Sequence, residues 1–254
     1  MKIVLLAGAV FITAFFCSAN AQNYLKQTAD IKTDDGFIIA ADIITLSEDY
    51  GPGILALHNH GRNRGDWEPL VKYLADGGIS KALAIDIRGH GESILKNKAD
   101  DSTTDTLNYS QFKRNDYLDI INDIVYAFDY LKSLEGVDSL KCGIIGARSG
   151  AVYAVKTAIK QSQTDFLILL SPQVIYRGVA INDDIKNVND LPVLIIANEN
   201  IEDDLNNGKW LYKNCSSEYK KKKIFNDSDF NPRSPESWPK LGDYIAVWLK
   251  KVLK

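Results

Sequence analysis

The chain has 254 residues, of which 45% are hydrophobic and 25% are charged, and its formal net charge is −3. This length and composition are those of a globular protein with a full hydrophobic core, and they exclude a disordered or fibrous chain. The small acidic excess provides no basic surface for nucleic acid, so no nucleic-acid partner is expected.

The first 21 residues have the pattern of a signal peptide. A lysine near the start precedes the apolar run Ile3–Phe16, and the small residues Ala19 and Ala21 stand where signal peptidase would cleave. We therefore expect export to the periplasm or the cell exterior, with residues 22–254 forming one mature domain. A lipid anchor on Cys17 is the less favoured alternative, because bulky phenylalanines precede that cysteine. No integral membrane segment is expected after signal removal, because the apolar run is short for a span and no later segment approaches its length.

The mature chain alternates extended and helical patterns, which is typical of a mostly parallel β-sheet covered by helices on both faces. It opens with two extended runs around Asp34, Asp35 and Gly36, which predict an antiparallel hairpin. The predicted strands are 29–32, 37–46, 53–58, 82–87, 141–145, 166–170, 193–197 and 222–225. The predicted helices are 67–75, 117–134, 151–160 and 244–253. The polar stretch 97–109 is expected to form a long surface loop.

Two turns that follow predicted strands carry informative motifs. The sequence LHNHGR stands at 57–62, and DIRGHGES stands at 86–93. In the second motif the glycines permit a tight turn and the polar side chains can hold it together. His90, which belongs to that turn, is therefore expected to be structural.

A third segment, VDSLKCGIIGARSG at 137–150, leads from a predicted strand into a predicted helix. Gly146 and Gly150 flank Arg148 with the spacing of a sharp strand-to-helix turn that lifts its central residue above the sheet. Together the three segments resemble the α/β-hydrolase superfamily, nearest its esterase and dienelactone-hydrolase-like members. The resemblance covers essentially the whole mature chain. It implies about eight strands, helices on both faces, no large cap, and a nucleophile at the position of Arg148.

Arg148 cannot serve as that nucleophile, because a guanidinium stays protonated and has no lone pair with which to attack a carbonyl. Shifting the register by one residue would put Ser149 at the turn, and Ser149 remains the alternative nucleophile. The shift moves the strand–helix junction and abandons both flanking glycines, which favours the register centred on Arg148.

The sequence contains three histidines, His58, His60 and His90. All of them precede the strand-to-helix turn at Gly146–Gly150, called the elbow below. The resemblance implies a catalytic histidine in a loop after the last strand, where this chain has NDSDF at 226–230. A serine with no imidazole in reach lacks its general base and remains a poor nucleophile. His60 lies on the oxyanion side of the site and is the histidine that could reach the cleft in an unfamiliar role.

The position of the family's catalytic acid falls on Asn200 or Ile201, in the loop after the strand 193–197. The nearby carboxylates are Glu199 and Glu202 in that loop, and Asp227 and Asp229 in the loop where the histidine is implied. We expect Arg148 to pair with one of these four carboxylates, because a buried charge without compensation is costly. The alternative is an Arg148 side chain that extends into solvent.

No cofactor and no metal site are expected. His58 and His60 alternate along an extended segment and point to opposite sides, and no cysteine pair has metal-ligand spacing. No glycine-rich loop suits a phosphate. Cys142 and Cys215 could pair in an oxidising compartment, but Cys142 lies in an apolar strand, so both are expected to be unpaired.

The leading hypothesis is an exported pseudohydrolase, in which the former active-site cleft binds a ligand without acyl transfer. The candidate ligand-binding residues are His60, Gly61, Arg62, Arg148 and Ser149, and their charge suits a small anion such as a carboxylate. The alternatives are a divergent serine esterase that acts through Ser149 and a module that binds a protein partner, not identified, through its outer surface.

Overall fold

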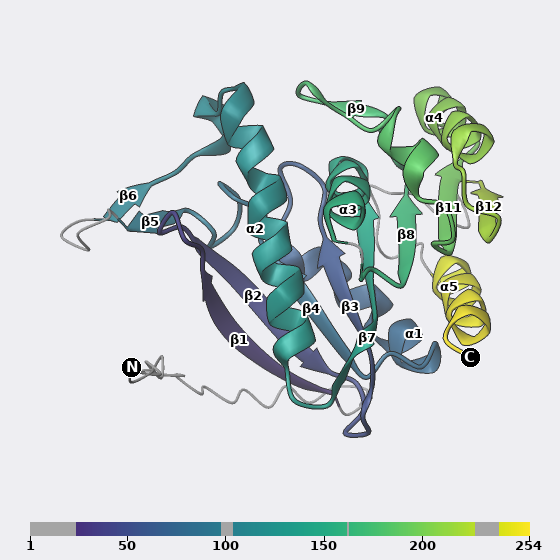
Figure 1. The fold of residues 1–254 in the computed structure, drawn as a ribbon, viewed down its shortest axis with the longest axis horizontal. Coiled ribbons are helices and arrows are strands. Elements are labelled where there is room, and N and C mark those ends of the chain that lie inside the picture. The colour runs from purple at the N-terminus through teal and green to yellow at the C-terminus, as the bar shows by residue number, and fades with distance from the viewer. Residues whose placement is uncertain (1–23, 98–103, 162, 227–238) are drawn as a thin grey trace.

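The computed structural model of the protein describes residues 24–97, 104–161, 163–226 and 239–254. Its centre is an eight-stranded sheet in the order β1-β2-β4-β3-β7-β8-β11-β12 (Figure 1). The strands are β1 Leu25–Lys32, β2 Ile38–Thr45, β3 Gly51–Leu57, β4 Lys81–Ile85, β7 Val137–Ala147, β8 Phe166–Leu170, β11 Val193–Asn198 and β12 Lys220–Phe225. β2 is antiparallel to both of its neighbours, and every later pairing in this sheet is parallel. The predicted sheet is confirmed, including its opening hairpin.

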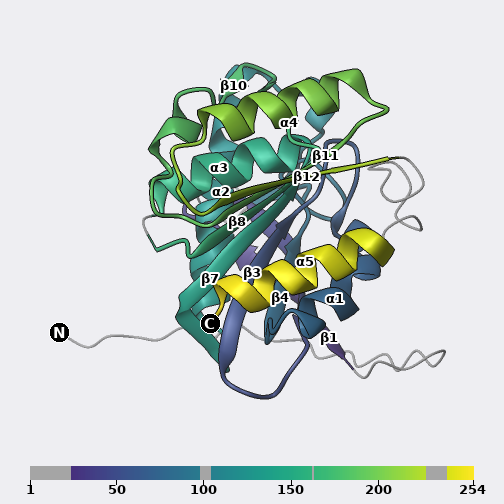
Figure 2. The same ribbon diagram turned by 90° about the vertical axis from the view of Figure 1, so that its right-hand side faces the viewer.

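Helices cover both faces of the sheet (Figure 2). One face carries α2 (Arg114–Ser133), α3 (Ser149–Lys160) and α4 (Glu202–Asn214), and the other carries α1 (Val71–Asp76) and α5 (Pro239–Val252). A separate cluster of buried apolar side chains fills the space between the sheet and each helical layer. Within the described ranges, no helix is both long and apolar enough to cross a membrane.

Two helices differ from the prediction. The helix expected at 67–75 begins as a 3₁₀ turn, η1 (Arg64–Leu70), which contains Pro69, and continues as α1. Helix α4 was not predicted at all. It buries Asp204, Gly208 and Leu211, of which a single side chain is apolar, so the sequence of α4 lacks the apolar stripe that marks a helix packed on a core.

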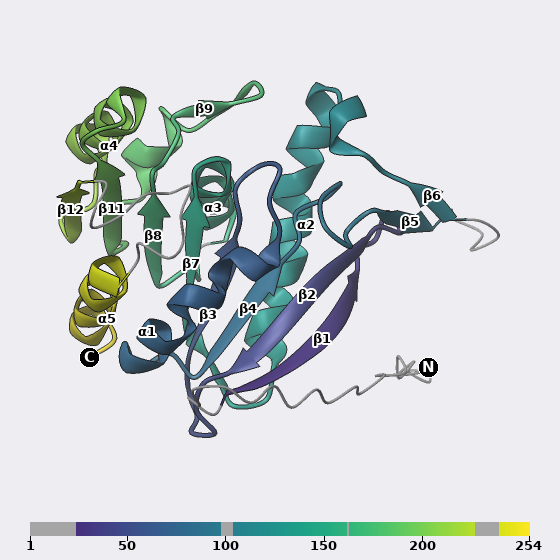
Figure 3. The same cartoon turned by 180° about the vertical axis from the view of Figure 1, so that it is seen from behind.

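Two hairpins were also missed. β9 (Ile175–Tyr176) and β10 (Val179–Ala180) stand beyond the carboxyl ends of the central strands (Figure 1). β5 (Leu95–Asn97) pairs with β6 (Thr104–Thr106) at the side of the sheet near β1 and β2 (Figure 3). The prediction of a loop over 97–109 is therefore wrong in its described parts. Residue 97 ends β5, residues 104–106 form β6, and residue 109 begins the 3₁₀ turn η2 (Tyr109–Gln111).

Cys142 and Cys215 are both buried and free. The predicted signal peptide, with its cleavage position and Cys17, lies outside the described residues, as do Asp227 and Asp229.

Candidate functional site

The turn between β7 and α3 carries Arg148 at its top. Arg148 is the N-cap residue of α3 and has φ 51° and ψ −107°, a backbone conformation that is strained for any residue with a side chain. Its N–H donates to the carbonyl of Leu170, at the end of β8, over 2.8 Å. Ser149 is the first residue of the helix that follows. The backbone therefore places Arg148 on the turn and Ser149 within α3.

Close backbone contacts require both flanking glycines. A Cβ atom on Gly146 would lie 2.5 Å from the carbonyl oxygen of Gly150, and a Cβ atom on Gly150 would lie 2.2 Å from the carbonyl oxygen of Leu57. Neither position can carry a side chain unless the backbone moves. The glycine spacing in the sequence thus matches the geometry of a turn centred on Arg148.

The side chain of Ser149 is committed to local hydrogen bonds. Ser149 is 1% exposed, and its Oγ accepts the backbone N–H of His60 over 2.8 Å. The same oxygen donates to Oδ1 of Asn59 over 3.1 Å. No imidazole nitrogen of the described chain, which includes all three histidines, forms a hydrogen bond with it. A general base for Ser149 is therefore absent from these contacts.

The backbone donors that could stabilise an oxyanion are also engaged. In hydrolases with such a turn, these donors come from the residue after the nucleophile and from the loop after the third strand. Here the N–H of Ser149 faces Oδ1 of Asn59 at 3.5 Å, and the N–H of His60 is bonded to Ser149 Oγ. Both N–H groups therefore already face a side-chain oxygen of this chain.

The three histidines form one cluster beside the elbow. His58 is fully buried: its Nδ1 lies 2.7 Å from the carbonyl oxygen of the next residue, and its Nε2 accepts the N–H of Ile87 over 2.9 Å. Nδ1 of His60 lies 3.2 Å from Nε2 of His90, and Nδ1 of His90 lies 3.1 Å from the carbonyl oxygen of Arg88. These bonds hold the turns after β3 and β4 together. In the part of the chain that the structure describes, no group of three or more His, Cys, Asp and Glu residues is suited to a metal ion.

Burial lowers the pKa of all three histidines. It is the largest cause for His58 and for His60, and the pKa of each is lowered to about 4. The positive charges of His90 and Arg177 lower the pKa of His60 further, and the pKa of His90 is lowered mainly by its own burial. A general base works best when its pKa is near the working pH. These imidazoles are therefore neutral and weakly basic at pH 7.

Four residues stand near the predicted position of the acid: Glu199, Asn200 and Ile201 lie in the loop after β11, and Glu202 begins α4. Glu199, Asn200 and Glu202 are exposed, and Ile201 is half-buried. Among the residues described, neither glutamate forms an ion pair with Arg148. The predicted pairing of Arg148 with Asp227 or Asp229 concerns residues outside the described ranges and stays a prediction.

A buried carboxylate missed by the sequence analysis stands close by, in the first turn of α4. Asp204 is 3% exposed, and its Oδ2 accepts the hydroxyl of Ser171 over 2.8 Å and the N–H of Asn198 over 2.9 Å. Burial raises the pKa of Asp204, and the positive charge of Arg148 lowers it. Asp204 is thus a described carboxylate whose pKa responds to the charge of Arg148.

The loop after β3 contributes Gly61 and Arg62, both candidates for ligand binding. Gly61 has φ 75°, and a Cβ atom there would meet no atom within 4 Å. Arg62 is bonded to Asp66 through Nε at 2.8 Å and Nη2 at 2.7 Å, on the surface of the protein. The guanidinium of Arg62 is therefore neutralised within its own loop, whereas Arg148 is not paired in this way.

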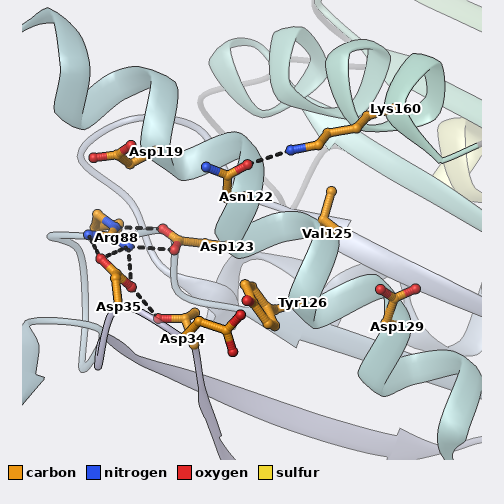
Figure 4. Close-up of a pocket in the computed structure, with 11 residues that line it drawn as sticks. Asp34, Asp35, Arg88, Asp119, Asn122, Asp123, Val125, Tyr126, Asp129 and Lys160 are labelled. Carbon is orange, nitrogen blue, oxygen red and sulfur yellow. Dashed lines mark hydrogen bonds and ion pairs between the residues drawn. The ribbon is translucent and has the colours of Figure 1, made fainter. Parts of the chain in front are cut away.

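A pocket of about 560 Å³ lies away from the elbow, between α2 and the turn that joins β1 to β2 (Figure 4). Its charged lining consists of Asp34, Asp35, Asp119, Asp123, Asp129, Arg88 and Lys160. Arg88 is bonded to Asp123 over 2.6 Å and to Asp35 over 3.2 Å. Because carboxylates outnumber cations here, this pocket is unsuited to an anion.

Comparison with solved structures identifies the architecture. A dienelactone hydrolase from Anabaena variabilis ATCC 29413 superposes with a TM-score of 0.70 at 14% identity, covering 91% of this chain and 99% of that one. Acetyl xylan esterase 1 from Thermoanaerobacterium sp. JW/SL YS485 gives a TM-score of 0.69 at 15% identity, covering 95% of this chain and 88% of that one. A cold-adapted esterase from an Arctic intertidal metagenomic library gives 0.64 at 16% identity, covering 96% and 100%. No protein-family model and no curated protein sequence matches the chain. At these identities the comparisons show the fold, which is the α/β-hydrolase fold.

Proposed function

We propose that this protein is a non-catalytic α/β-hydrolase scaffold that binds a small anion at its elbow through Arg148. The observation that carries the proposal is the position of Arg148, whose φ of 51° places it on the strained turn where a nucleophile would stand. A guanidinium at that point can bind an anion bidentately but cannot attack a carbonyl. Backbone strain of this kind is kept where a function depends on it.

The surroundings of Arg148 suit an anion. Arg148 caps the N-terminus of the 12-residue helix α3, where the helix dipole favours negative charge and disfavours an isolated cation. An anion bound to the guanidinium would satisfy the charge of Arg148 and the dipole of α3 together. Asp204, whose own pKa is affected by Arg148, offsets part of this charge from the side of α4.

The contacts of Ser149 argue against the alternative of a divergent serine esterase. Its hydroxyl is buried, accepts an N–H from His60 and donates to Asn59, so attack would require breaking both bonds. His60 contributes its backbone to Ser149, while its imidazole bonds to His90.

Isothermal titration calorimetry with acetate, benzoate, succinate and inorganic phosphate tests anion binding. We expect at least one of these anions to bind saturably, and Arg148→Gln to weaken that binding by about tenfold, because one charge-assisted pair is removed. Lys141→Gln is the control, since that lysine is exposed in the first half of β7, at the opposite end of the strand from Arg148. Absence of saturable binding, or equal binding by Arg148→Gln, would contradict the proposal.

Export is part of the proposal and rests on the sequence pattern of residues 1–21. Expression of the full-length chain with its own N-terminus, followed by fractionation and N-terminal sequencing, tests this. The expected product begins at Gln22 and lies outside the cytoplasm, and an uncleaved cytoplasmic chain would contradict export.

A further inference from the structure

The arginines of this chain fall into two groups. Three of those described lie in ion pairs: Arg62 with Asp66, Arg64 with Asp42, Asp86 and Glu92, and Arg88 with Asp35 and Asp123. The other three, Arg114, Arg148 and Arg177, form no ion pair with any carboxylate in the described ranges. All three belong to segments at the carboxyl end of the sheet (Figure 1). The described part of the chain thus has three arginines without an ion pair at the carboxyl end of the sheet.

The side chain of Arg114 lies beside the β9–β10 turn, which carries Arg177. Arg177 is exposed and lies in that turn with φ 48°. A Cβ atom on the next residue, Gly178, would be 3.9 Å from Nε of Arg114. Arg114 is the first residue of the 20-residue helix α2, where the helix dipole disfavours a cation unless an anion accompanies it.

An aromatic cluster lies beneath these arginines. The ring of Tyr176 in β9 has its centroid 5.5 Å from that of His60, 5.9 Å from that of Tyr117 and 6.3 Å from that of Tyr153. Tyr109 packs edge-on against His60 at 4.5 Å. His60, Tyr109 and Tyr176 are half-buried, whereas Tyr117 and Tyr153 lie below them and are 6% and 1% exposed. The half-buried rings therefore form an open aromatic face above a buried layer.

One hydroxyl in the buried layer has no partner. Oη of Tyr153 is buried and forms no hydrogen bond with any described residue. Burial raises the pKa of this phenol, so it stays protonated and remains a hydrogen-bond donor. Oη of Tyr176 in the half-buried layer is likewise buried without a partner among the described residues. A buried hydroxyl without a partner is costly, so an ordered water or a polar group of a ligand is expected to complete each of them.

We propose that this site binds an aromatic carboxylate, with its ring on the face formed by His60, Tyr109 and Tyr176 and its carboxylate on Arg114 and Arg177. This inference goes beyond the proposed function, because it places the carboxylate of the ligand on Arg114 and Arg177 and not on Arg148. Edge and face contacts between rings favour an aromatic body over an aliphatic one of equal size. Guanidinium pairs select a planar carboxylate. A hydroxyl on the ligand ring supplies the missing partner of Tyr153.

The test uses four probes in calorimetry with the mature protein: benzoate, 4-hydroxybenzoate, cyclohexanecarboxylate and acetate. We expect benzoate to bind about tenfold tighter than cyclohexanecarboxylate or acetate, because stacking adds to the charge pair. We expect 4-hydroxybenzoate to bind a further ~3-fold tighter because it gains one hydrogen bond. Arg114→Gln and Arg177→Gln should each weaken benzoate binding about fivefold. Lys141→Gln, at an exposed position in the first half of β7, should leave it unchanged.

Tyr153→Phe keeps the ring and removes only the hydroxyl, so it tests the buried contact without emptying the core. It should abolish the advantage of 4-hydroxybenzoate and leave the affinity for benzoate within about twofold. Equal affinities for benzoate and cyclohexanecarboxylate, or no effect of Arg114→Gln and Arg177→Gln, would overturn the inference. If acetate or phosphate binds through Arg148 and an aromatic ring does not raise the affinity, the proposed function is supported and the proposed ligand class is wrong. If no anion binds, both proposals are wrong.

Discussion

The backbone N–H of His60 donates to Oγ of Ser149 over 2.8 Å, and this bond joins the loop after β3 to the first turn of α3. The donor belongs to the main chain of a histidine, so the serine receives a structural bond where a catalytic serine would face an imidazole. The hydroxyl of Ser149 donates a hydrogen bond to Oδ1 of Asn59, which also faces the N–H of Ser149. These hydrogen bonds together hold the loop after β3 against the first turn of α3.

Removing the Ser149 hydroxyl should therefore cost stability. Ser149→Ala leaves the N–H of His60 and one acceptor site of Asn59 unpaired in a buried place, which is expected to lower the free energy of unfolding by about 1–3 kcal/mol. Urea unfolding monitored by tryptophan fluorescence measures this. Ser133→Ala is the control, because that serine is exposed and bonds to the nearby carbonyl of Tyr130, and it should change stability by less than about 0.5 kcal/mol. Equal stability of Ser149→Ala and wild type would show that the bonds around Ser149 are unimportant.

Replacing Arg148 should separate stability from binding. Arg148→Gly relieves the positive φ and is expected to raise the free energy of unfolding by about 1 kcal/mol, while anion binding is lost. Arg148→Ala should lose binding equally and gain no stability, because alanine keeps the strain. Thermal unfolding and calorimetry on the same samples measure both effects. A glycine variant that is less stable than the alanine variant would contradict the view that Arg148 is retained for its side chain at the cost of strain.

Much of the fold could be predicted because the buried strands are short apolar runs, such as Phe166–Leu170, whose predicted and observed bounds coincide. Helix α4 could not be predicted, because it lies at the edge of the molecule and buries little apolar surface. The β9–β10 hairpin has two residues in each strand, too few for a pattern of alternation.

In the candidate site, too, some residues could be predicted from the sequence and others could not. Arg148 was identifiable because the constraint lies in a local motif, with glycines two residues away on each side. Asp204 escaped notice because it reaches the elbow from the helix that was missed, and only the contact between chain segments distant in sequence reveals it. Tyr176 belongs to the missed hairpin, and its aromatic neighbours His60, Tyr117 and Tyr153 come from three other segments, so no local pattern could assemble them.

The histidines should titrate well below neutral pH. The pKa of His58 and of His60 is lowered to about 4, so their ¹H NMR signals should shift between about pH 3 and 5 and not near pH 7. Because the unfolded chain has an ordinary pKa near 6.5, the contribution of His58 to stability is complete above that pH and is lost as the pH falls through 4. It amounts to at most about 3 kcal/mol.

The contribution of Asp123 to the free energy of unfolding changes with pH in the opposite direction to that of His58 between about pH 4 and 6. Burial raises its pKa to about 6 in spite of its bond to Arg88, so its contribution to stability is present below about pH 4 and is lost as the pH rises through 6. The histidine prediction is therefore read from the individual resonances and not from overall stability. An imidazole pKa near 7 would contradict the description and restore a candidate general base.

Neutralising Asp204 should strengthen anion binding. Asp204→Asn retains one oxygen that can accept from Ser171 and Asn198 while removing the negative charge near Arg148. We expect the affinity for the bound anion to rise about two- to fivefold, and the free energy of unfolding to change by less than about 1 kcal/mol. Calorimetry on wild type and variant measures this. Weaker binding by the variant would mean that Asp204 holds Arg148 in its binding position instead of competing with the anion.

The central claim is that this hydrolase scaffold performs no acyl transfer through a serine. Incubating the mature protein with a fluorophosphonate probe and recording its intact mass tests that claim most directly, with a panel of activated esters assayed in parallel. The account predicts an unmodified mass and no turnover above the uncatalysed rate. A stoichiometric adduct and ester turnover that both disappear in Ser149→Ala would contradict it.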